Sequence, residues 1–156
     1  MDINTLIETL TDAVVSQDDI TAWSTIEYGH GYHVFENIDM RNPPEETDCP
    51  LIIIRPQSKS GGMNASVKSF TLGIDCLVFD SGIPVEINGL IRFKGGRLVE
   101  ELRAMVFAKI HGALPSDCHV GDLAVDYDTV EQFPYIWCGM TINIEQEQLI
   151  GVNPYE

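Results

Sequence analysis

Basic residues are scarce in this sequence, and its closing stretch has none. The 156 residues include 9 lysines and arginines against 24 aspartates and glutamates, and none of the nine falls between Leu114 and Glu156. The resulting net charge of -15 repels the phosphate backbone of nucleic acids. The composition therefore argues against a body that binds DNA or RNA through a basic surface.

Long apolar runs and paired cysteines are also missing. No stretch approaches the roughly 18 apolar residues of a membrane span, and the N-terminal Met-Asp-Ile-Asn-Thr lacks the basic segment of a secretory signal. The four cysteines are widely spaced, which favours reduced thiols in the core over disulfides: Cys49, Cys76, Cys118 and Cys138. We therefore expect an intracellular protein with no membrane contact.

Motifs of catalysis and metal binding are absent or weak. The sequence has no nucleophile elbow, no HExxH and no phosphate loop. A zinc site can be drawn from His30, His33 and Cys118-His119, but without CxxC-type ligand pairs surface histidines are the simpler interpretation. A calcium hand needs a glycine-centred loop, so three aspartates are instead expected on a solvated strand face: Asp122, Asp126 and Asp128. We predict no enzyme, no metal and no cofactor.

Two segments carry the spacing of three and four residues that is typical of an amphipathic helix. The first covers Ile3 to Val15, with Asp2 as its expected N-cap. The second has its apolar stripe over Leu98 to Ile110 and is expected to end before a C-cap glycine, Gly112. A shorter helix is expected from about residue 18 to the glycines near residue 29.

The stretch from Pro50 to Asp80 organises the expected sheet. Leu51 to Ile54 has no alternation, which is typical of a strand covered on both faces. In the next strand, alternate apolar residues define a core face: Phe70, Leu72, Ile74, Cys76 and Val78. Further strands are expected as an edge at 32–39, on either side of the Asn88-Gly89 turn, and as a closing pair over 123–128 and 135–145.

This order of elements predicts an α+β fold. We expect a mainly antiparallel sheet of about four to six strands with two principal helices packed on one face. The length suits a single domain over residues 1–156. The polar run 57–68, with Gly61-Gly62 as a hinge, is expected to be a flexible arm, and residues 146–156 a loose tail.

The charges divide the chain into three blocks. Residues 1–50 hold eleven acids and one base, 51–113 five acids and eight bases, and 114–156 eight acids alone. The simplest interpretation is a solvated surface that keeps the protein soluble. A second is that subunits meet head to tail, with the basic middle of one against an acidic part of the next. For such an interface the sequence offers eight candidates: Arg55, Lys59, Lys68, Leu77, Phe79, Arg92, Lys94 and Arg97.

The succession of an N-terminal helix, the 51–79 strand pair with its arm, the 98–110 helix and the 123–144 closing pair resembles the tail terminator, or tail-completion, proteins of long-tailed bacteriophages and prophages. The resemblance rests on size and element order and transfers no individual functional residue. It implies a minor tail protein, an α+β subunit that forms a ring, expected to be a hexamer, and ends polymerisation of the tail tube. It also implies a tail tube protein and a head-tail connector protein as partners, DNA only as passing cargo, and a place in the virion tail after assembly in the host cytoplasm.

Two other classes of function stay open at this point. An acidic protein that mimics DNA and inhibits a DNA-binding partner requires carboxylates spaced like phosphates on one exposed face, whereas the acids here are split by a basic middle. A small enzyme or ligand-binding domain requires a pocket with converging polar groups and perturbed pKa values.

Overall fold

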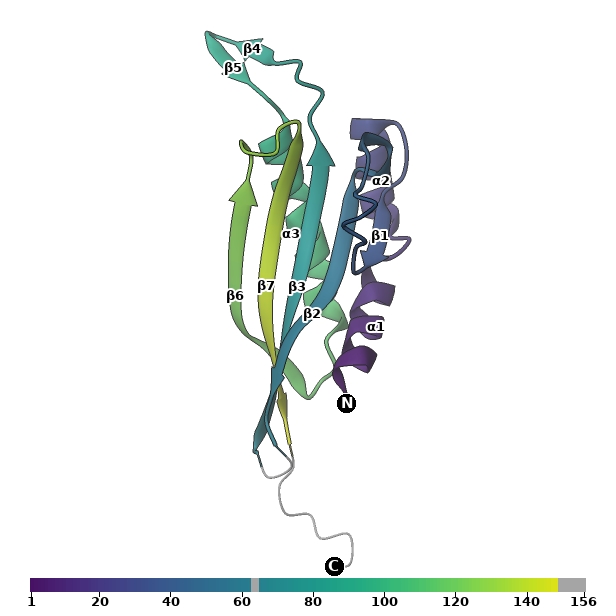
Figure 1. The fold of residues 1–156 in the computed structure, drawn as a ribbon, viewed down its shortest axis with the longest axis vertical. Helices are drawn as coiled ribbons and strands as arrows, with labels where there is room; N and C mark the ends of the chain where they lie inside the picture. The colour runs from purple at the N-terminus through teal and green to yellow at the C-terminus, as the bar shows by residue number, and fades with distance from the viewer. Residues whose placement is uncertain (63–64, 149–156) are drawn as a thin grey trace, which may run out of the picture.

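The computed structural model describes residues 1–62 and 65–148. Its elements follow the chain in this order: α1 (Ile3–Val14), α2 (Asp18–Tyr28), β1 (His33–Glu36), a 3-10 helix (Glu46–Asp48), β2 (Leu51–Ser60), β3 (Val67–Phe79), β4 (Val85–Ile87), β5 (Leu90–Arg92), α3 (Gly95–Ala113), β6 (Cys118–Asp128) and β7 (Tyr135–Glu147). The strands form a five-stranded sheet in the order β1-β2-β3-β7-β6, and β4 and β5 form a separate hairpin (Figure 1).

The ends of the helices follow local backbone chemistry. Asp2 caps α1 as predicted, since its side chain accepts the backbone N–H of Thr5 at 2.9 Å. The short helix α2 ends at Gly29, whose φ of 78° is left-handed. The prediction of Gly112 as a C-cap was wrong, because α3 continues to Ala113 and stops where Leu114 turns extended before Pro115.

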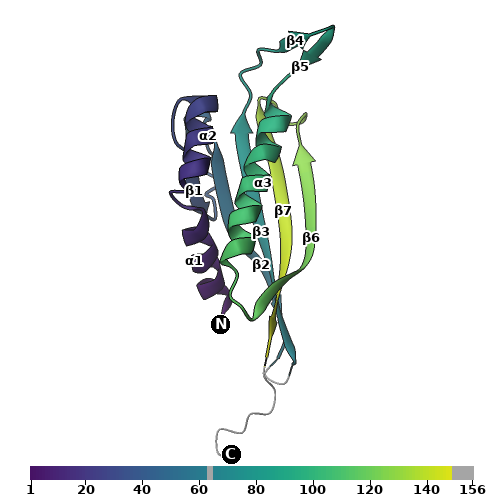
Figure 2. The ribbon, with the colours of Figure 1, turned by 180° about the vertical axis from the view of Figure 1, so that it is seen from behind.

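The helices cover one face of the sheet, and the α+β prediction is confirmed. In Figure 2, α1 lies beside α3; α3 packs on β3 and β7, and α1 packs on β2. The sheet is mainly antiparallel, with β1 running parallel to β2. The predicted core face of β3 is buried under the helices together with alternate residues of β7: Phe70, Leu72, Ile74, Cys76, Val78, Ile136, Cys138, Met140, Ile142 and Ile144.

The opposite face, which we call the open face, carries no α-helix within the described part of the chain (Figure 1). Beside β1 and β2 it builds a second apolar cluster from Cys49, Leu51 and Ile53, with half-buried neighbours around them: Phe35, Ile38, Leu77, Phe79 and Tyr135. Ile38 and Cys49 belong to the segment between β1 and β2. The chain's own residues therefore cover Leu77 and Phe79 in part, and contact of these two residues with a partner stays a prediction.

Half of the predicted arm is strand, and its residues 63–64 lie outside the described residues. β2 continues to Ser60 and β3 begins at Val67, and Ser60 pairs with Ser69. A flexible arm over 57–68 was therefore wrong for 57–60 and for 67–68, and these residues form a twisted ribbon that projects from one end of the body (Figure 1). We call this the arm ribbon.

The first residues of the predicted loose tail are part of a strand. β7 runs to Glu147 and pairs with β3 as far as Val67, so the arm ribbon has a third strand. Gln146 is buried and donates a side-chain hydrogen bond to Asp117 at 2.7 Å. Residues 149–156 of the predicted tail lie outside the described residues.

A second projection leaves the other end of the molecule. β4 and β5 form a short hairpin whose turn residues Asn88 and Gly89 have φ values of 51° and 80°. This confirms the predicted turn, in which both central positions need positive φ. The hairpin stands clear of the five-stranded sheet in both views (Figures 1 and 2).

The cysteines are reduced in this structure, as predicted. Cys49, Cys76 and Cys138 are buried, Cys118 is half-buried, and all four are free thiols. Burial raises the pKa of the Cys138 thiol to about 11 and that of Cys49 to about 12, which keeps both protonated at neutral pH. Among the described residues, no helix has the length and apolar character needed to cross a membrane.

Candidate interaction surfaces

The structure does not gather the eight predicted interface residues on one surface. Lys59 and Lys68 lie on the arm ribbon, and Arg55, Leu77 and Phe79 lie on the open face. The other three lie at the opposite end from the arm ribbon, on β5 and around the start of α3: Arg92, Lys94 and Arg97. The basic candidates are thus divided among the arm ribbon, the open face and the opposite end of the molecule.

The hairpin end carries an exposed apolar surface, which we call the tip patch. Ile83 is 75% exposed and Ile91 62%, although both are large hydrophobic residues. The patch combines the hairpin and its flanks with the turn between β6 and β7: Ile83, Ile87, Leu90, Ile91, Phe93, Val130 and Phe133. Contiguous exposed apolar patches on soluble proteins mark interaction sites.

The two parts of the tip patch are joined by an aromatic contact. The rings of Phe93 and Phe133 lie edge to face with centroids 5.8 Å apart. Together with Val130 and Ile136 they line a shallow hollow of about 550 Å³. Ile87 pairs with Leu90 on one side of the hairpin, and Ile91 lies on the other side opposite the exposed Glu86, so each side of the hairpin carries large apolar side chains.

Basic residues surround the base of the tip patch. Arg92 ends the hairpin, Lys94 is the N-cap residue of α3, and Arg97 follows in its first turn. None of the three makes a salt bridge within residues 1–62 and 65–148, whereas Arg103 pairs with Glu100 and Lys109 with Asp19. Glu27 and Glu101 line the same hollow as these three residues without forming an ion pair with them, so the tip end combines apolar area with basic side chains that have no direct salt-bridge partner in the described part of the chain.

The arm ribbon is polar. The outer part of β2 is exposed from Pro56 to Ser60, and Lys59 and Lys68 lie on the helix side, near the start of α1. Phe70, which pairs with Lys59 across the strands, is only 3% exposed and fixes the base of the ribbon to the core.

The open face contains a polar group that sequence analysis missed. Arg55 Nε and Trp137 Nε1 donate to the two carboxylate oxygens of Asp75, at 2.9 Å and 3.1 Å. Asp75 is only 7% exposed, and the Trp137 ring lies across Gly139, where a Cβ would collide with it. The group ties β2, β3 and β7 together. Its signal in the sequence was a charged residue in the middle of a central strand.

An acidic row follows β6 along the open face. Asp122, Asp126 and Asp128 pair with Asn143, Gly139 and Trp137 of β7, which confirms that the three aspartates share one side of the strand. Asp122 and Asp126 are exposed. This edge of the open face is therefore negative, while the edge at β1 is partly apolar.

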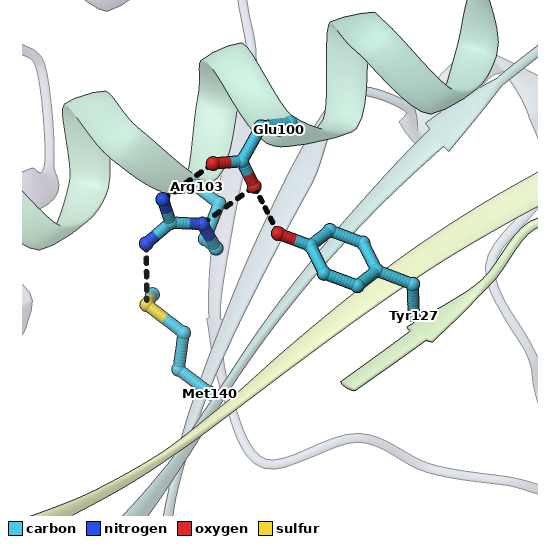
Figure 3. A network of polar contacts seen from close by, with 4 residues as sticks. All are labelled: Glu100, Arg103, Tyr127 and Met140. Carbon is cyan, nitrogen blue, oxygen red and sulfur yellow. Dashed lines mark hydrogen bonds and ion pairs between the residues drawn. The ribbon is translucent and has the colours of Figure 1, made fainter. Parts of the chain in front are cut away.

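A polar clamp joins α3 to the strands beneath the tip patch (Figure 3). Arg103 donates from Nε and Nη2 to the two carboxylate oxygens of Glu100, at 2.6 Å and 2.5 Å, and Tyr127 donates its hydroxyl to the same carboxylate. The hydrogen bond from Arg103 lowers the pKa of Glu100 below its ordinary value. The Arg103 Nη1 atom also lies 4.0 Å from the sulfur of Met140.

A further hollow, of about 450 Å³, lies between α2 and the start of α3. Its lining includes Tyr28, Asp80 and Lys94. The Tyr28 hydroxyl is buried with no hydrogen-bond partner among the described residues, and burial raises its pKa. Both carboxylate oxygens of Asp80 already have hydrogen-bond partners, because they accept the backbone N–H groups of Gly82 and Gly95, each at 2.8 Å.

The residues considered for zinc lie on opposite edges of the sheet. His33 is on β1 and Cys118-His119 begin β6, and these two strands are the edges of the five-stranded sheet. Within the described ranges, no three potential ligands come together as a metal site. Comparison of the sequence with protein-family models and with curated proteins finds no match.

Proposed function

We propose that this protein is a structural subunit of a bacteriophage or prophage tail, a tail terminator that assembles into a ring. The observation that carries the proposal is the tip patch, in which large apolar side chains stand exposed on a hairpin outside the core. A two-stranded hairpin of this kind is only marginally stable alone, so covering it by another subunit stabilises it.

The distribution of surfaces favours a ring over a symmetric dimer. The tip end is apolar and basic, whereas residues 1–40, which form α1, α2 and β1, contain eight acids and no lysine or arginine. Contacts between unlike surfaces are heterologous, and they close into a ring when the rotation between neighbours permits. The order and size of the elements resemble those of the tail terminators. This resemblance is the reason for proposing a tail terminator and not another kind of ring-forming protein.

The open face suits the wall of a lumen that DNA crosses. Its β6 side carries Asp122, Asp126 and Asp128, and carboxylates on such a wall repel the phosphates of passing DNA. In this proposal the tail tube protein and the head-tail connector protein meet the two ends of the ring.

The proposal is tested first by the state of the purified chain. Light scattering coupled to gel filtration, over a wide range of protein concentration, is expected to show a single closed oligomer, and electron microscopy is expected to show rings with a central hole. Added to polymerising tail tubes, the protein is expected to shorten them by capping one end. A chain that stays monomeric at every concentration, or rings that leave tube length unchanged, would contradict the proposal.

A further inference from the structure

We infer that the tip patch of one copy docks on the outer side of α2 of a second copy. The inference rests on the proposed function, since it requires that copies of the chain assemble, and it specifies the two surfaces that meet. The receiving surface, which we call the α2 face, consists of Asp18, Ala22 and Ile26. These residues recur every four positions, so they share one side of the helix, and all three are exposed.

The α2 face has an apolar centre with no partner within the described chain. Ile26 is 81% exposed, and no large hydrophobic residue in the described part of the chain is more exposed. The small side chain of Ala22, one turn earlier, leaves room for a neighbour to approach the helix. The opposite side of the same helix buries Ile20 and Ser24, so α2 is already anchored and does not need Ile26 for its own packing. An exposed isoleucine on an anchored helix is available to the apolar side chains of a neighbour's hairpin.

Charge complementarity selects a second copy as the occupant. The α2 face begins with Asp18, and Glu27 follows Ile26 on the same helix; α1 and β1, on the same side of the subunit, add the exposed acids Glu8, Asp12 and Glu36. The base of the tip patch brings Arg92, Lys94 and Arg97, which make no salt bridge among the described residues, although Glu27 and Glu101 of the same copy line the same hollow. Complementary potentials of this kind orient two surfaces and raise the rate of association.

The shape of the subunit places the two surfaces on opposite sides. In Figures 1 and 2 the hairpin leans toward the side of β6, and α2 lies on the side of β1. These are the two edges of the sheet. A neighbour placed beside β6 with its α2 toward that edge therefore comes under the overhanging hairpin, and repetition of this contact continues from copy to copy.

Two matched variants test the contact in the full-length chain. Ile91→Asp disables the tip patch and Ile26→Asp disables the α2 face. Both side chains are exposed, so each variant is expected to fold with an unchanged circular dichroism spectrum and unfolding transition. Each is expected to raise the dissociation constant for self-association about tenfold or more, because a buried charge replaces an apolar contact. Met40→Asp, at a residue that is 76% exposed and outside both surfaces, is the control and is expected to assemble normally.

Mixing the two variants distinguishes the proposed contact from its alternatives. Ile91→Asp keeps an intact α2 face, and Ile26→Asp keeps an intact tip patch, so an equimolar mixture is expected to form a dimer of one copy of each and nothing larger. Raising the salt concentration is expected to weaken that dimer, because it screens the basic residues of one surface from the carboxylates of the other.

The outcomes that overturn the inference are specific. If Ile26→Asp assembles like the unmodified chain, the tip patch binds elsewhere, and if the mixture remains monomeric, the contact is not between these two surfaces. Either result leaves the proposed ring standing when the unmodified chain forms rings. A chain that never associates overturns the proposed function together with this inference.

Discussion

The arm ribbon and the tip hairpin project from opposite ends of the protein, and they are held by different means. The arm ribbon has a polar surface, a third strand supplied by β7, and Phe70 buried at its base. The tip hairpin has strands of three residues, no third strand among the described residues, and a surface that exposes Ile87, Leu90 and Ile91. The first is therefore an extension of the folded core, whereas the second leaves its large apolar side chains exposed and, as a two-stranded hairpin, is only marginally stable by itself.

The largest expected difference between the two ends lies in their aromatic anchors. Replacing Phe70 by alanine empties a site that is 3% exposed, and such a change typically lowers the free energy of unfolding by about 3–5 kcal/mol. Phe93, at the base of the tip hairpin, is 47% exposed, so Phe93→Ala is expected to cost less than about 1 kcal/mol. Urea denaturation of the monomer at low protein concentration measures both.

These two substitutions separate stability from assembly. Phe93→Ala is expected to weaken self-association while the denaturation midpoint barely changes, and Phe70→Ala is expected to do the reverse at temperatures where it remains folded. Equal losses of unfolding free energy in the two variants would show that the tip hairpin is part of the cooperative core. The hairpin and the arm ribbon would then not differ in the way they are held.

A smaller difference is expected at the glycines of the two turns. Gly61 has a φ of 105° and a Cβ there would stand 2.8 Å from the carbonyl oxygen of Val67. Gly89 has a φ of 80°, but a Cβ there meets nothing within 4 Å. Gly61→Ala therefore adds a backbone clash to the strain of positive φ and is expected to cost about 2 kcal/mol, against about 1 kcal/mol for Gly89→Ala.

Hydrogen exchange localises these two effects. Gly61→Ala is expected to lower the protection of amides in β3 and β7 along the arm ribbon, whereas Gly89→Ala is expected to affect only the tip hairpin, whose amides exchange readily in the monomer. A loss of protection in β7 caused by Gly89→Ala would mean that the hairpin supports the sheet.

The same contrast explains what sequence reasoning recovered. Apolar periodicity predicted α1, α3 and the core face of β3. In these elements the buried residues, such as Leu102 and Ile74, recur with the period of a helix or a strand. The strands of the arm ribbon were not predicted, because their residues are polar. Their strand conformation depends on pairing with β7, which is distant in the sequence. Non-local pairing leaves no periodic signal in a polar segment.

The candidate surfaces were harder to predict for a related reason. Leu77 and Phe79 make both faces of β3 apolar at the end of the strand. The sequence does not say whether a partner or the chain's own 37–50 segment covers the second face. The Asn88-Gly89 turn identified the tip hairpin, yet exposure of its isoleucines follows from its distance from the body. The sequence shows the basic residues as one block along the chain. In the folded protein they are spread over the arm ribbon, the open face, α3 and the hairpin end.

The smallest expected effect concerns the clamp of Glu100, Arg103 and Tyr127, which ties α3 to β6 close to the tip patch. Because Arg103 lowers the pKa of Glu100 in the folded protein, the unfolded chain binds the proton more readily. The stabilisation is therefore complete above the unfolded pKa of about 4.3 and is lost as the pH falls through the lower, folded pKa. Glu100 is 43% exposed in this pair, and exposed ion pairs contribute about 0.5 kcal/mol.

Measuring the free energy of unfolding from neutral pH down to strongly acidic pH tests this contribution. Glu100→Gln is expected to be less stable than the unmodified chain at neutral pH, with the difference shrinking as the pH falls. Tyr127→Phe keeps the ion pair and removes only the hydroxyl donor, so its pH dependence is expected to follow that of the unmodified chain. A difference for Glu100→Gln that stays constant with pH would mean that its carboxylate charge is irrelevant there, and that shape alone secures β6 beneath the hairpin.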